Sequence, residues 1–333
     1  MKLVSFQMGL QTRLGALTSG DIIDLNTAYT SFLVSRRVSF PFTRALEEMP
    51  PAMIPFLELG KDGMKRAQDL LNWIDSGELP KDEKARQVRY PLTKARILAP
   101  VPCPRKIIVV GLNYAEHVSE SQVDIPDWPW TFGKLSTVLV GPGEPIGRPP
   151  LTRHLDGEVE LAVIIGKRGK YISKERARDH VAGYSVFNDV SARNLQFEGE
   201  PGLRFFYLGK NFQDSAALGP YLVTSDEIPD PHCLDLTMYY NDRVIRKGNT
   251  RQMIFKVEEL IAFYSRFFTV EPGDVISTGC PPAVEKREHH VFFDEDYGFL
   301  SPGDRCICEV QDVGVLQNPI VEASSKLSCG HRT

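Results

Sequence analysis

The chain has 333 residues, of which 42% are hydrophobic and 25% are charged, a composition ordinary for a soluble globular protein of one or two domains. Its formal net charge of −4 argues against nucleic acid and anionic membranes as partners, and no apolar run approaches the roughly 18 residues that a membrane-spanning helix needs. The first residues do not resemble a secretory signal, and six scattered cysteines without a Cys-x-x-Cys pair favour reduced thiols. We therefore expect a cytoplasmic protein, with the mitochondrial matrix as the alternative.

The first hundred residues predict a small α/β domain. Its expected strands are 2–6 and 22–25, and its expected helices are 27–37, 43–48 and 61–76. Helical spacing is clearest in the last of these, where one face carries Met64, Ala67, Leu70, Leu71 and Ile74. The proline-rich stretch 90–104 then marks a domain boundary near residue 100.

The pattern beyond residue 105 is mainly β. The expected strands are 106–110, 159–165, 181–189, 234–240, 274–278 and 305–310, and the expected helices are 114–120, 173–180 and 257–267. Because strands do not alternate regularly with helices, we predict the α+β class with a large mixed or antiparallel sheet. The chain then divides into an N-terminal domain (1–100), a larger domain (101–321) and a polar tail (322–333).

Acidic residues inside apolar strands are the most informative feature. Glu158 and Glu160 are two residues apart on an expected strand, so both side chains should project to the same face. Two adjacent buried carboxylates repel each other and resist desolvation, and a divalent cation relieves both effects. Asp189, at the end of the next strand, is placed to complete such a site. Oxygen ligands suit Mg²⁺, Mn²⁺ and Ca²⁺ alike.

A histidine and a glutamate follow the strand 106–110. His117 and Glu120 are three residues apart, so they share one face of a helical turn, where the carboxylate can orient the imidazole as a general base. The alternative is an exposed surface pair on a short helix, which the spacing alone favours.

Several polar residues are candidates for substrate binding. Lys210 and Lys134 lie between apolar stretches, where each can bind a carboxylate or stabilise an oxyanion, or can simply extend its amine to solvent from a strand end. Arg193 and Gln196 follow Asp189 closely and can reach the same cavity. Thr278 begins a sharp turn after a strand, which suits either a site backbone or a plain turn.

Other patterns are weaker or missing. His289 and His290 with Asp294 and Asp296 form a second metal candidate, but neighbouring residues of a strand face opposite sides, which favours a solvated surface. The chain has no Gly-x-Ser-x-Gly, Gly-x4-Gly-Lys, Gly-x-Gly-x-x-Gly or His-Glu-x-x-His motif. Serine hydrolases, P-loop NTPases, Rossmann dehydrogenases and zincins therefore lose support.

Seven short motifs, in order from about residue 106 to 321, resemble the fumarylacetoacetate hydrolase family. They are Gly111-Leu112-Asn113-Tyr114 with His117 and Glu120; Phe132-Gly133-Lys134 followed by Gly141-Pro142-Gly143-Glu144-Pro145-Ile146; Asp156-Gly157-Glu158-Val159-Glu160; Asn188-Asp189-Val190-Ser191-Ala192-Arg193; Gly209-Lys210; Gly273-Asp274-Val275-Ile276-Ser277-Thr278-Gly279; and Pro302-Gly303-Asp304. The resemblance implies a mixed β-roll with a smaller N-terminal domain, as in the longer, two-domain members. The chain departs from the family at Cys280, where threonine is usual, at Ala283-Val284-Glu285, where Gly-Val-Gly is usual, and at Leu135, where proline is common.

The resemblance also implies a site and a reaction. Glu158, Glu160 and Asp189 are the implied ligands of a divalent metal, usually Mg²⁺, with His117 and Glu120 as the catalytic pair on a lid and Lys210 beside the substrate. The expected enzyme is a homodimeric, metal-dependent hydrolase that cleaves a C–C bond in an acylpyruvate or related 1,3-dioxo acid, as in aromatic or sugar-acid catabolism. The alternatives are a lyase or isomerase of 2-oxo acids, such as a decarboxylase, hydratase or enol isomerase, and a non-catalytic metal-binding scaffold.

Overall fold

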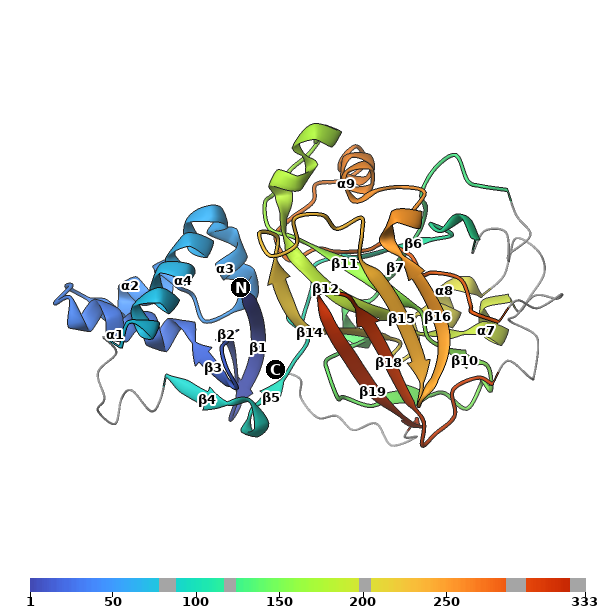
Figure 1. Cartoon of the computed structure of the whole chain (residues 1–333), viewed down its shortest axis with the longest axis horizontal. Coiled ribbons are helices and arrows are strands. Elements are labelled where there is room, and N and C mark those ends of the chain that lie inside the picture. Colours follow the sequence, from blue (N-terminus) through green and yellow to red (C-terminus); the bar gives the residue numbers. More distant parts are fainter. Residues whose placement is uncertain (78–87, 117–123, 198–204, 286–297, 324–333) are drawn as a thin grey trace.

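The computed structural model describes residues 1–77, 88–116, 124–197, 205–285 and 298–323. Figure 1 shows the N-terminal helices gathered at one end of the molecule and a larger body, rich in strands, at the other. The helices are α1 (Leu25–Ser35), α2 (Pro41–Glu48), α3 (Met53–Glu58), α4 (Gly60–Asp75), α7 (Arg193–Phe197), α8 (Phe206–Lys210) and α9 (Val257–Ser265). Shorter 3₁₀ helices are η1 (Leu92–Lys94), η2 (Ser136–Val138), η3 (Lys174–His180) and η4 (Thr250–Gln252). No helix of the described residues is both long and apolar enough to cross a bilayer.

The largest sheet runs through both ends of the molecule. Its strands follow one another in the order β4 (Arg89–Pro91), β3 (Asp21–Asp24), β2 (Gln11–Leu17), β1 (Lys2–Met8), β14 (Ala216–Thr224), β12 (Val181–Asp189), β11 (Val159–Ile165), β17 (Val275–Ser277), β6 (Ile107–Gly111) and β7 (Trp130–Lys134). Two short strands join its sides, β5 (Arg96–Ile97) on β1 and β8 (Leu139–Val140) on β14. Most neighbours are antiparallel, but β17 pairs with β6 and β14 with β8 in parallel.

A second sheet packs across the first. It has the order β16 (Arg243–Asn249), β15 (Asp235–Tyr240), β18 (Arg305–Val310), β19 (Gly314–Glu322) and β9 (Ile146–Arg148). A two-stranded ribbon joins β10 (Leu155–Asp156) to β13 (Ser191–Ala192). These mixed sheets with few helices confirm the α+β fold and the family architecture predicted from the sequence. The predicted α-helix over 173–180 is a 3₁₀ helix.

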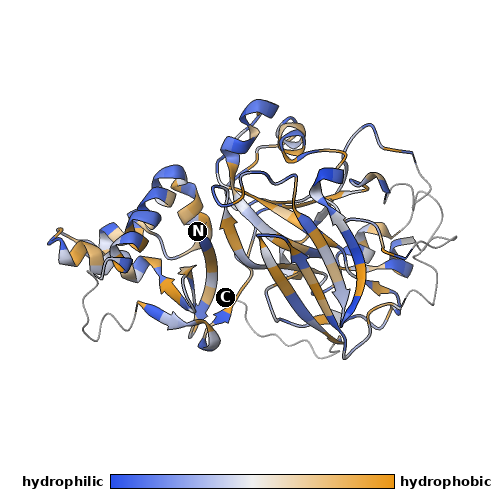
Figure 2. Ribbon diagram, in the orientation of Figure 1, coloured by the Kyte–Doolittle hydropathy of each residue, from blue (hydrophilic) through white to orange (hydrophobic). Residues whose placement is uncertain are grey.

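Two hydrophobic clusters hold these layers together. One lies between the sheets and is built around β11, β15 and β18. The other covers the opposite face of the large sheet and contains side chains from the N-terminal helices, such as Trp73, together with Ala162 and Phe187 of the central strands. In Figure 2 the hydrophobic residues follow these inner strands. Because β11 and β12 are buried along their whole length, any polar group on them is held in a water-poor setting.

Candidate active site

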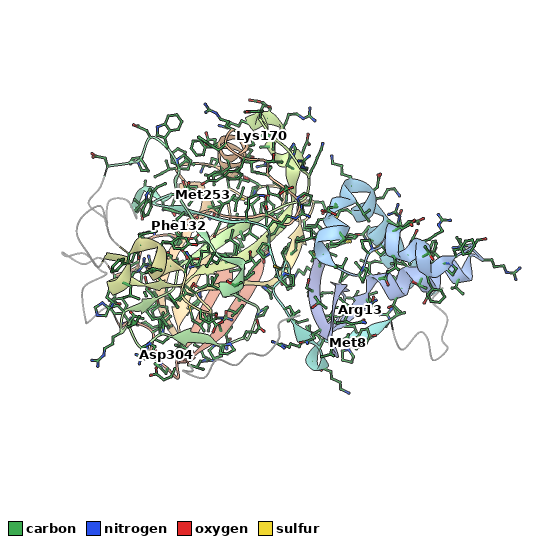
Figure 3. All side chains as sticks on the ribbon, turned by 180° about the vertical axis from the view of Figure 1, so that it is seen from behind. Met8, Arg13, Phe132, Lys170, Met253 and Asp304 are labelled. Atoms are coloured by element: carbon green, nitrogen blue, oxygen red, sulfur yellow. The ribbon has the colours of Figure 1, made fainter. Side chains whose placement is uncertain are left out.

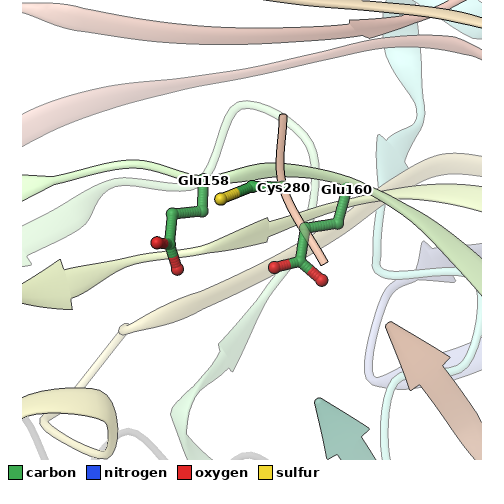
Figure 4. A group of neighbouring side chains, drawn as sticks. All are labelled: Glu158, Glu160 and Cys280. Atoms are coloured by element: carbon green, nitrogen blue, oxygen red, sulfur yellow. The ribbon is translucent and has the colours of Figure 1, made fainter. Parts of the chain in front are cut away.

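Three buried carboxylates lie where β11 and β12 run side by side. Glu158 directly precedes β11, Glu160 is the second residue of β11, and Asp189 is the last residue of β12. Their exposed fractions are only 6%, 2% and 0%. Figure 4 shows Glu158 and Glu160 projecting to the same side of the strand, as their spacing of two residues predicts.

Two lysine ammonium groups lie among these carboxylates. Lys210 ends α8, and its Nζ donates to Glu158 Oε2 at 2.5 Å and to Asp189 Oδ2 at 2.6 Å. Lys134 ends β7, and its Nζ donates to Asp189 Oδ1 at 2.5 Å and to the Val190 carbonyl at 3.1 Å. Burial lowers the pKa of Lys134 to about 8. Burial acts on Lys210 too, but the charges of Asp189 and Glu158 outweigh it and raise the pKa of that lysine.

An aromatic group covers the lysine side of the site. The Lys210 ammonium lies 5.2 Å from the ring centre of Phe132, a residue of β7 that Figure 3 labels. The ring of Phe206, on α8, lies 5.1 Å from Phe132 and 4.8 Å from Trp130. The Lys210 ammonium is thus within cation–π distance of the Phe132 ring.

Arg193, the first residue of α7, ties the carboxylates to a second charged group. Its Nη2 donates to Glu158 Oε1 at 2.6 Å, its Nε donates to Asp156 Oδ2 at 2.9 Å, and its Nη1 donates to Gln196 Oε1 at 3.0 Å. Arg246, from β16, reaches the same oxygen of Asp156 at 2.9 Å. Burial would raise the pKa of Glu158, but Arg193 and the other nearby cations hold it well below its usual range. Glu158 is therefore ionised and fixed in place.

Glu160 has very different surroundings. Both hydrogen bonds that described residues donate to it come from neutral groups, Ser277 Oγ at 2.5 Å and the Gly279 amide at 2.8 Å, and both go to Oε2. Burial raises the pKa of Glu160 well above its usual range, and the charges of Asp189 and Glu158 add to the effect. A cation beside Glu160 would remove this penalty.

The arrangement of donor atoms fits a divalent cation. Ligand atoms of Glu158, Glu160 and Cys280 all lie within 4.8 Å of one another, the only such group among the described residues. Asp189 is not a member of this group, but Lys210 bridges it to Glu158. Buried carboxylate oxygens held this close together form the kind of site that hard cations occupy.

The other predicted residues have mixed placements. Thr278 lies beside the site but its Oγ1 donates to the Leu161 carbonyl at 3.0 Å, and Gln196 accepts from Arg193. His117 and Glu120 lie outside the described residues, as do His289, His290, Asp294 and Asp296 of the second metal candidate.

No role was predicted for Asp156 or Arg246, and Cys280 was noted only as a departure from the family pattern. Asp156 belongs to one of the motifs that resemble the family, so the sequence did contain a sign of its importance. Arg246 had none, because 90 residues separate it from Asp156 and only the fold brings the two together. Cys280 likewise lies near Glu158 and Glu160 only because the fold brings these distant residues together.

A sequence model of the fumarylacetoacetate hydrolase C-terminal region matches residues 106–321. The chain belongs to the fumarylacetoacetate hydrolase family. The oxaloacetate tautomerase Fahd2a, mitochondrial, of Rattus norvegicus is 38% identical over 329 residues, which cover 96% of this chain and 92% of that protein. The oxaloacetate tautomerase FAHD2A, mitochondrial, of Homo sapiens is 40% identical over 273 residues, which cover 82% of this chain and 81% of that protein.

A solved structure of the same family supports the fold over its full length. Maleylpyruvate hydrolase from Sphingobium sp. SYK-6, in complex with manganese(II) and pyruvate, has a TM-score of 0.71 and 26% identity, and the match covers 97% of this chain and all of that one. The resemblance predicted from the sequence motifs is therefore confirmed: this is a fumarylacetoacetate hydrolase family enzyme, and enzymes of this family act on small organic acids.

The expectation of a cytoplasmic location is wrong, because the similar tautomerases carry "mitochondrial" in their names. That expectation depended on reduced cysteines and on the lack of a secretory signal. Both features are equally compatible with the mitochondrial matrix, which is also a reducing compartment, so they did not separate the two locations.

Proposed function

We propose that this enzyme is a tautomerase that interconverts the enol and keto forms of oxaloacetate, and that it works in mitochondria. The observation that carries the proposal is the 38% identity with an oxaloacetate tautomerase over 96% of the chain. This reaction was among the alternatives that the sequence left open, as an enol isomerase of 2-oxo acids. It takes precedence here over C–C bond hydrolysis.

The reaction needs little more than proton transfer. A proton leaves C3 of the keto form and one is added to the C2 oxygen, so no water is consumed. One C–H bond is exchanged for an O–H bond, and the double bond moves from C2=O to C2=C3. The intermediate is an enolate, and its negative charge must be stabilised as it develops. A catalyst therefore needs positive charge near the C2 oxygen and a group that exchanges protons.

The described residues supply the first requirement. Lys210 and Lys134 hold two buried ammonium groups beside Asp189, and an enolate oxygen or a substrate carboxylate bound to them would replace part of their contacts with Asp189. A divalent cation held by Glu158, Glu160 and Asp189 would supply further positive charge as a Lewis acid. The three carboxylates taken by themselves suit Mg²⁺, with Mn²⁺ and Ca²⁺ as alternatives.

The remaining groups have supporting parts in this proposal. Arg193 and Gln196, first predicted to bind substrate, use their polar atoms on Asp156, Glu158 and each other, so we assign them to positioning Glu158. His117 and Glu120 are our candidates for exchanging the proton, and this part of the proposal depends on the sequence alone. A homodimer is likewise proposed from family resemblance.

Hydrolysis of an acylpyruvate is the second candidate. It is favoured by the similar maleylpyruvate hydrolase, whose structure matches 97% of this chain. The two candidates share the carboxylates and lysines and differ in whether a water molecule is activated to attack a carbonyl carbon.

Kinetics with freshly dissolved enol-oxaloacetate separate the candidates. The loss of enol absorbance would be followed in parallel with formation of the keto form, trapped by malate dehydrogenase, and cleavage of acylpyruvates would be assayed on the same preparation. We expect enzyme-dependent ketonisation that falls at least about a hundredfold, the effect typical of losing one stabilising group, in Lys210→Met and Glu158→Gln. The exposed Lys65, on α4, provides the control variant Lys65→Met, which should match the wild type.

Rapid cleavage of acylpyruvates without any acceleration of ketonisation would contradict the tautomerase and favour the hydrolase. Treatment with EDTA followed by Mg²⁺ tests the cation in the same assay. If neither reaction is accelerated with any divalent ion, the scaffold alternative would replace both.

A further inference from the structure

A cysteine thiol projects into the acidic centre from the turn that follows β17. Cys280 is 4% exposed, and its Sγ lies within 4.8 Å of carboxylate oxygens of both Glu158 and Glu160. Figure 4 shows its side chain directed toward Glu158, between the two glutamates. The thiol therefore faces the site and is not part of the apolar core behind it.

The turn that carries Cys280 is rigidly held. Gly279 has a φ of +90°, a conformation that side chains disfavour, and a Cβ there would lie 3.0 Å from the Val110 carbonyl and 2.9 Å from Asn113 Cβ. The amide of Gly279 donates to Glu160 at 2.8 Å, so the same turn is anchored to the carboxylate it faces. The position of Sγ relative to Glu160 is thus set by backbone geometry.

A buried polar atom near this point lacks a partner. Cys280 itself is a free thiol and only 4% exposed. Asn113 donates its side-chain amide to the Thr278 carbonyl at 2.8 Å, which ties the neighbouring Tyr114 to the turn that carries Cys280. The hydroxyl of Tyr114, a completely buried residue, has no hydrogen-bond partner among the described residues. A buried polar atom left unpaired close to a cluster of ligand atoms points to a bound species that would satisfy it.

We propose that Cys280 is a ligand of the cation, so that the centre is a mixed oxygen and sulfur site that favours Zn²⁺ or Co²⁺ over Mg²⁺. Carboxylates alone suit Mg²⁺, but a thiolate is a soft ligand that Mg²⁺ does not use and that Zn²⁺ and Co²⁺ bind well. As the sulfur–metal bond forms, the thiol proton is released to solvent. The inference deepens the proposed function, because it depends on the metal centre, but it holds for either candidate reaction.

A role as a metal ligand would account for the cysteine at position 280, where threonine is usual in the family. A threonine hydroxyl at this position would leave an all-oxygen site, which is the arrangement expected for Mg²⁺. Substituting sulfur for oxygen at one ligand changes the preference among ions without moving Glu158 or Glu160.

Binding of Co²⁺ to the intact, EDTA-treated protein tests the assignment without any measurement of activity. A thiolate bound to Co²⁺ gives an intense near-ultraviolet charge-transfer band that carboxylates do not give. We expect the wild type to show this band and Cys280→Ser to lose it. A matched control is Cys308→Ser, which removes another fully buried thiol, on β18, and should keep the band.

Calorimetric affinities complete the test. Affinity for Zn²⁺ should fall by about ten- to a hundredfold in Cys280→Ser, a range seen when groups that support a metal centre are removed, whereas affinity for Mg²⁺ should stay within about twofold. Cys280→Thr, with the residue usual in the family, provides a second variant should the serine variant not fold, and the same loss of the band is expected.

A band that persists in both variants, or a wild type that binds Co²⁺ without the band, would overturn the assignment of Cys280. If the wild type binds neither Co²⁺, Zn²⁺ nor Mg²⁺, the metal centre itself fails. Enol-oxaloacetate kinetics would then decide independently whether the tautomerase survives without it.

Discussion

Glu158 and Glu160 are two residues apart, yet their surroundings shift their pKa values in opposite directions. Arg193 and Lys210 keep Glu158 ionised, while the donors that the described residues offer Glu160 are one hydroxyl and one amide. The alternation of a strand allowed their shared face to be predicted from the sequence. The opposite shifts of their pKa values could not be predicted, because Arg193 and Lys210 reach Glu158 from positions 35 and 52 residues away along the chain.

The raised pKa of Glu160 predicts a pH-dependent stability of the metal-free protein. Because its folded pKa lies above the unfolded value, the stabilising contribution is complete below the unfolded pKa and is lost as the pH rises through the folded pKa. We expect metal-free Glu160→Gln to melt at a higher temperature than the wild type at neutral pH, with the difference shrinking toward about pH 4, near the ordinary glutamate pKa. Differential scanning calorimetry across this range measures the effect.

An exposed glutamate on a strand provides the control for this prediction. In Glu309→Gln, on β18, the difference in melting temperature between neutral and acid pH should be the same as in the wild type. A lower melting temperature for Glu160→Gln at neutral pH would show that its charge is already compensated, contrary to our account of why this centre attracts a cation.

At the scale of elements, predictions were best for strands whose apolar residues form a continuous run or a clear alternation. The predicted bounds of β11, β12 and β18 agree with the structure. The sequence analysis missed β14, β16 and β19, which contain Gly219-Pro220, Gly248 and Pro319. Glycine and proline ordinarily mark turns. Here they stay in strands because of pairing with partners far along the chain, as in the bulged pairing of β14 with β12.

Close packing requires a glycine at one position in a strand, and a substitution can test this. A Cβ added at Gly183, on β12, would lie 2.1 Å from the Val223 carbonyl of β14, a backbone atom that cannot rotate away. We expect Gly183→Ala to cost about 1–3 kcal/mol in the free energy of unfolding, the range typical of overpacking, measured by urea denaturation. Gly133→Ala on β7, where the nearest atom would be 3.7 Å away, should differ far less from the wild type. Equal stabilities for the two variants would contradict this packing argument.

At the scale of the whole molecule, the N-terminal residues are joined to the rest through both sheet and core. Leu3 of β1 pairs with Leu222 of β14, so one sheet continues from the N-terminal part into the catalytic part. Trp73 belongs to the same hydrophobic cluster as Phe187 of β12. The division at residue 100 remains our proposal for the domain boundary, but this shared core indicates that the two parts stabilise each other.

Shared packing predicts a single cooperative unfolding transition. Variants that keep only Trp73, on α4, or only Trp130, on β7, would report fluorescence from the two parts separately. We expect their urea transitions to coincide, because neither part can lose its packing without exposing the core of the other. Two transitions at clearly different urea concentrations would mean that the parts unfold independently.

The central claim is that the buried carboxylates of Glu158 and Glu160 hold a divalent cation. The most direct test is an anomalous difference map from crystals grown with Mn²⁺, for the wild type and for Glu158→Gln. We predict one strong peak within coordination distance of both glutamates in the wild type and none there in the variant. A wild-type crystal with no peak at these carboxylates, from protein that still converts enol-oxaloacetate, would contradict the account.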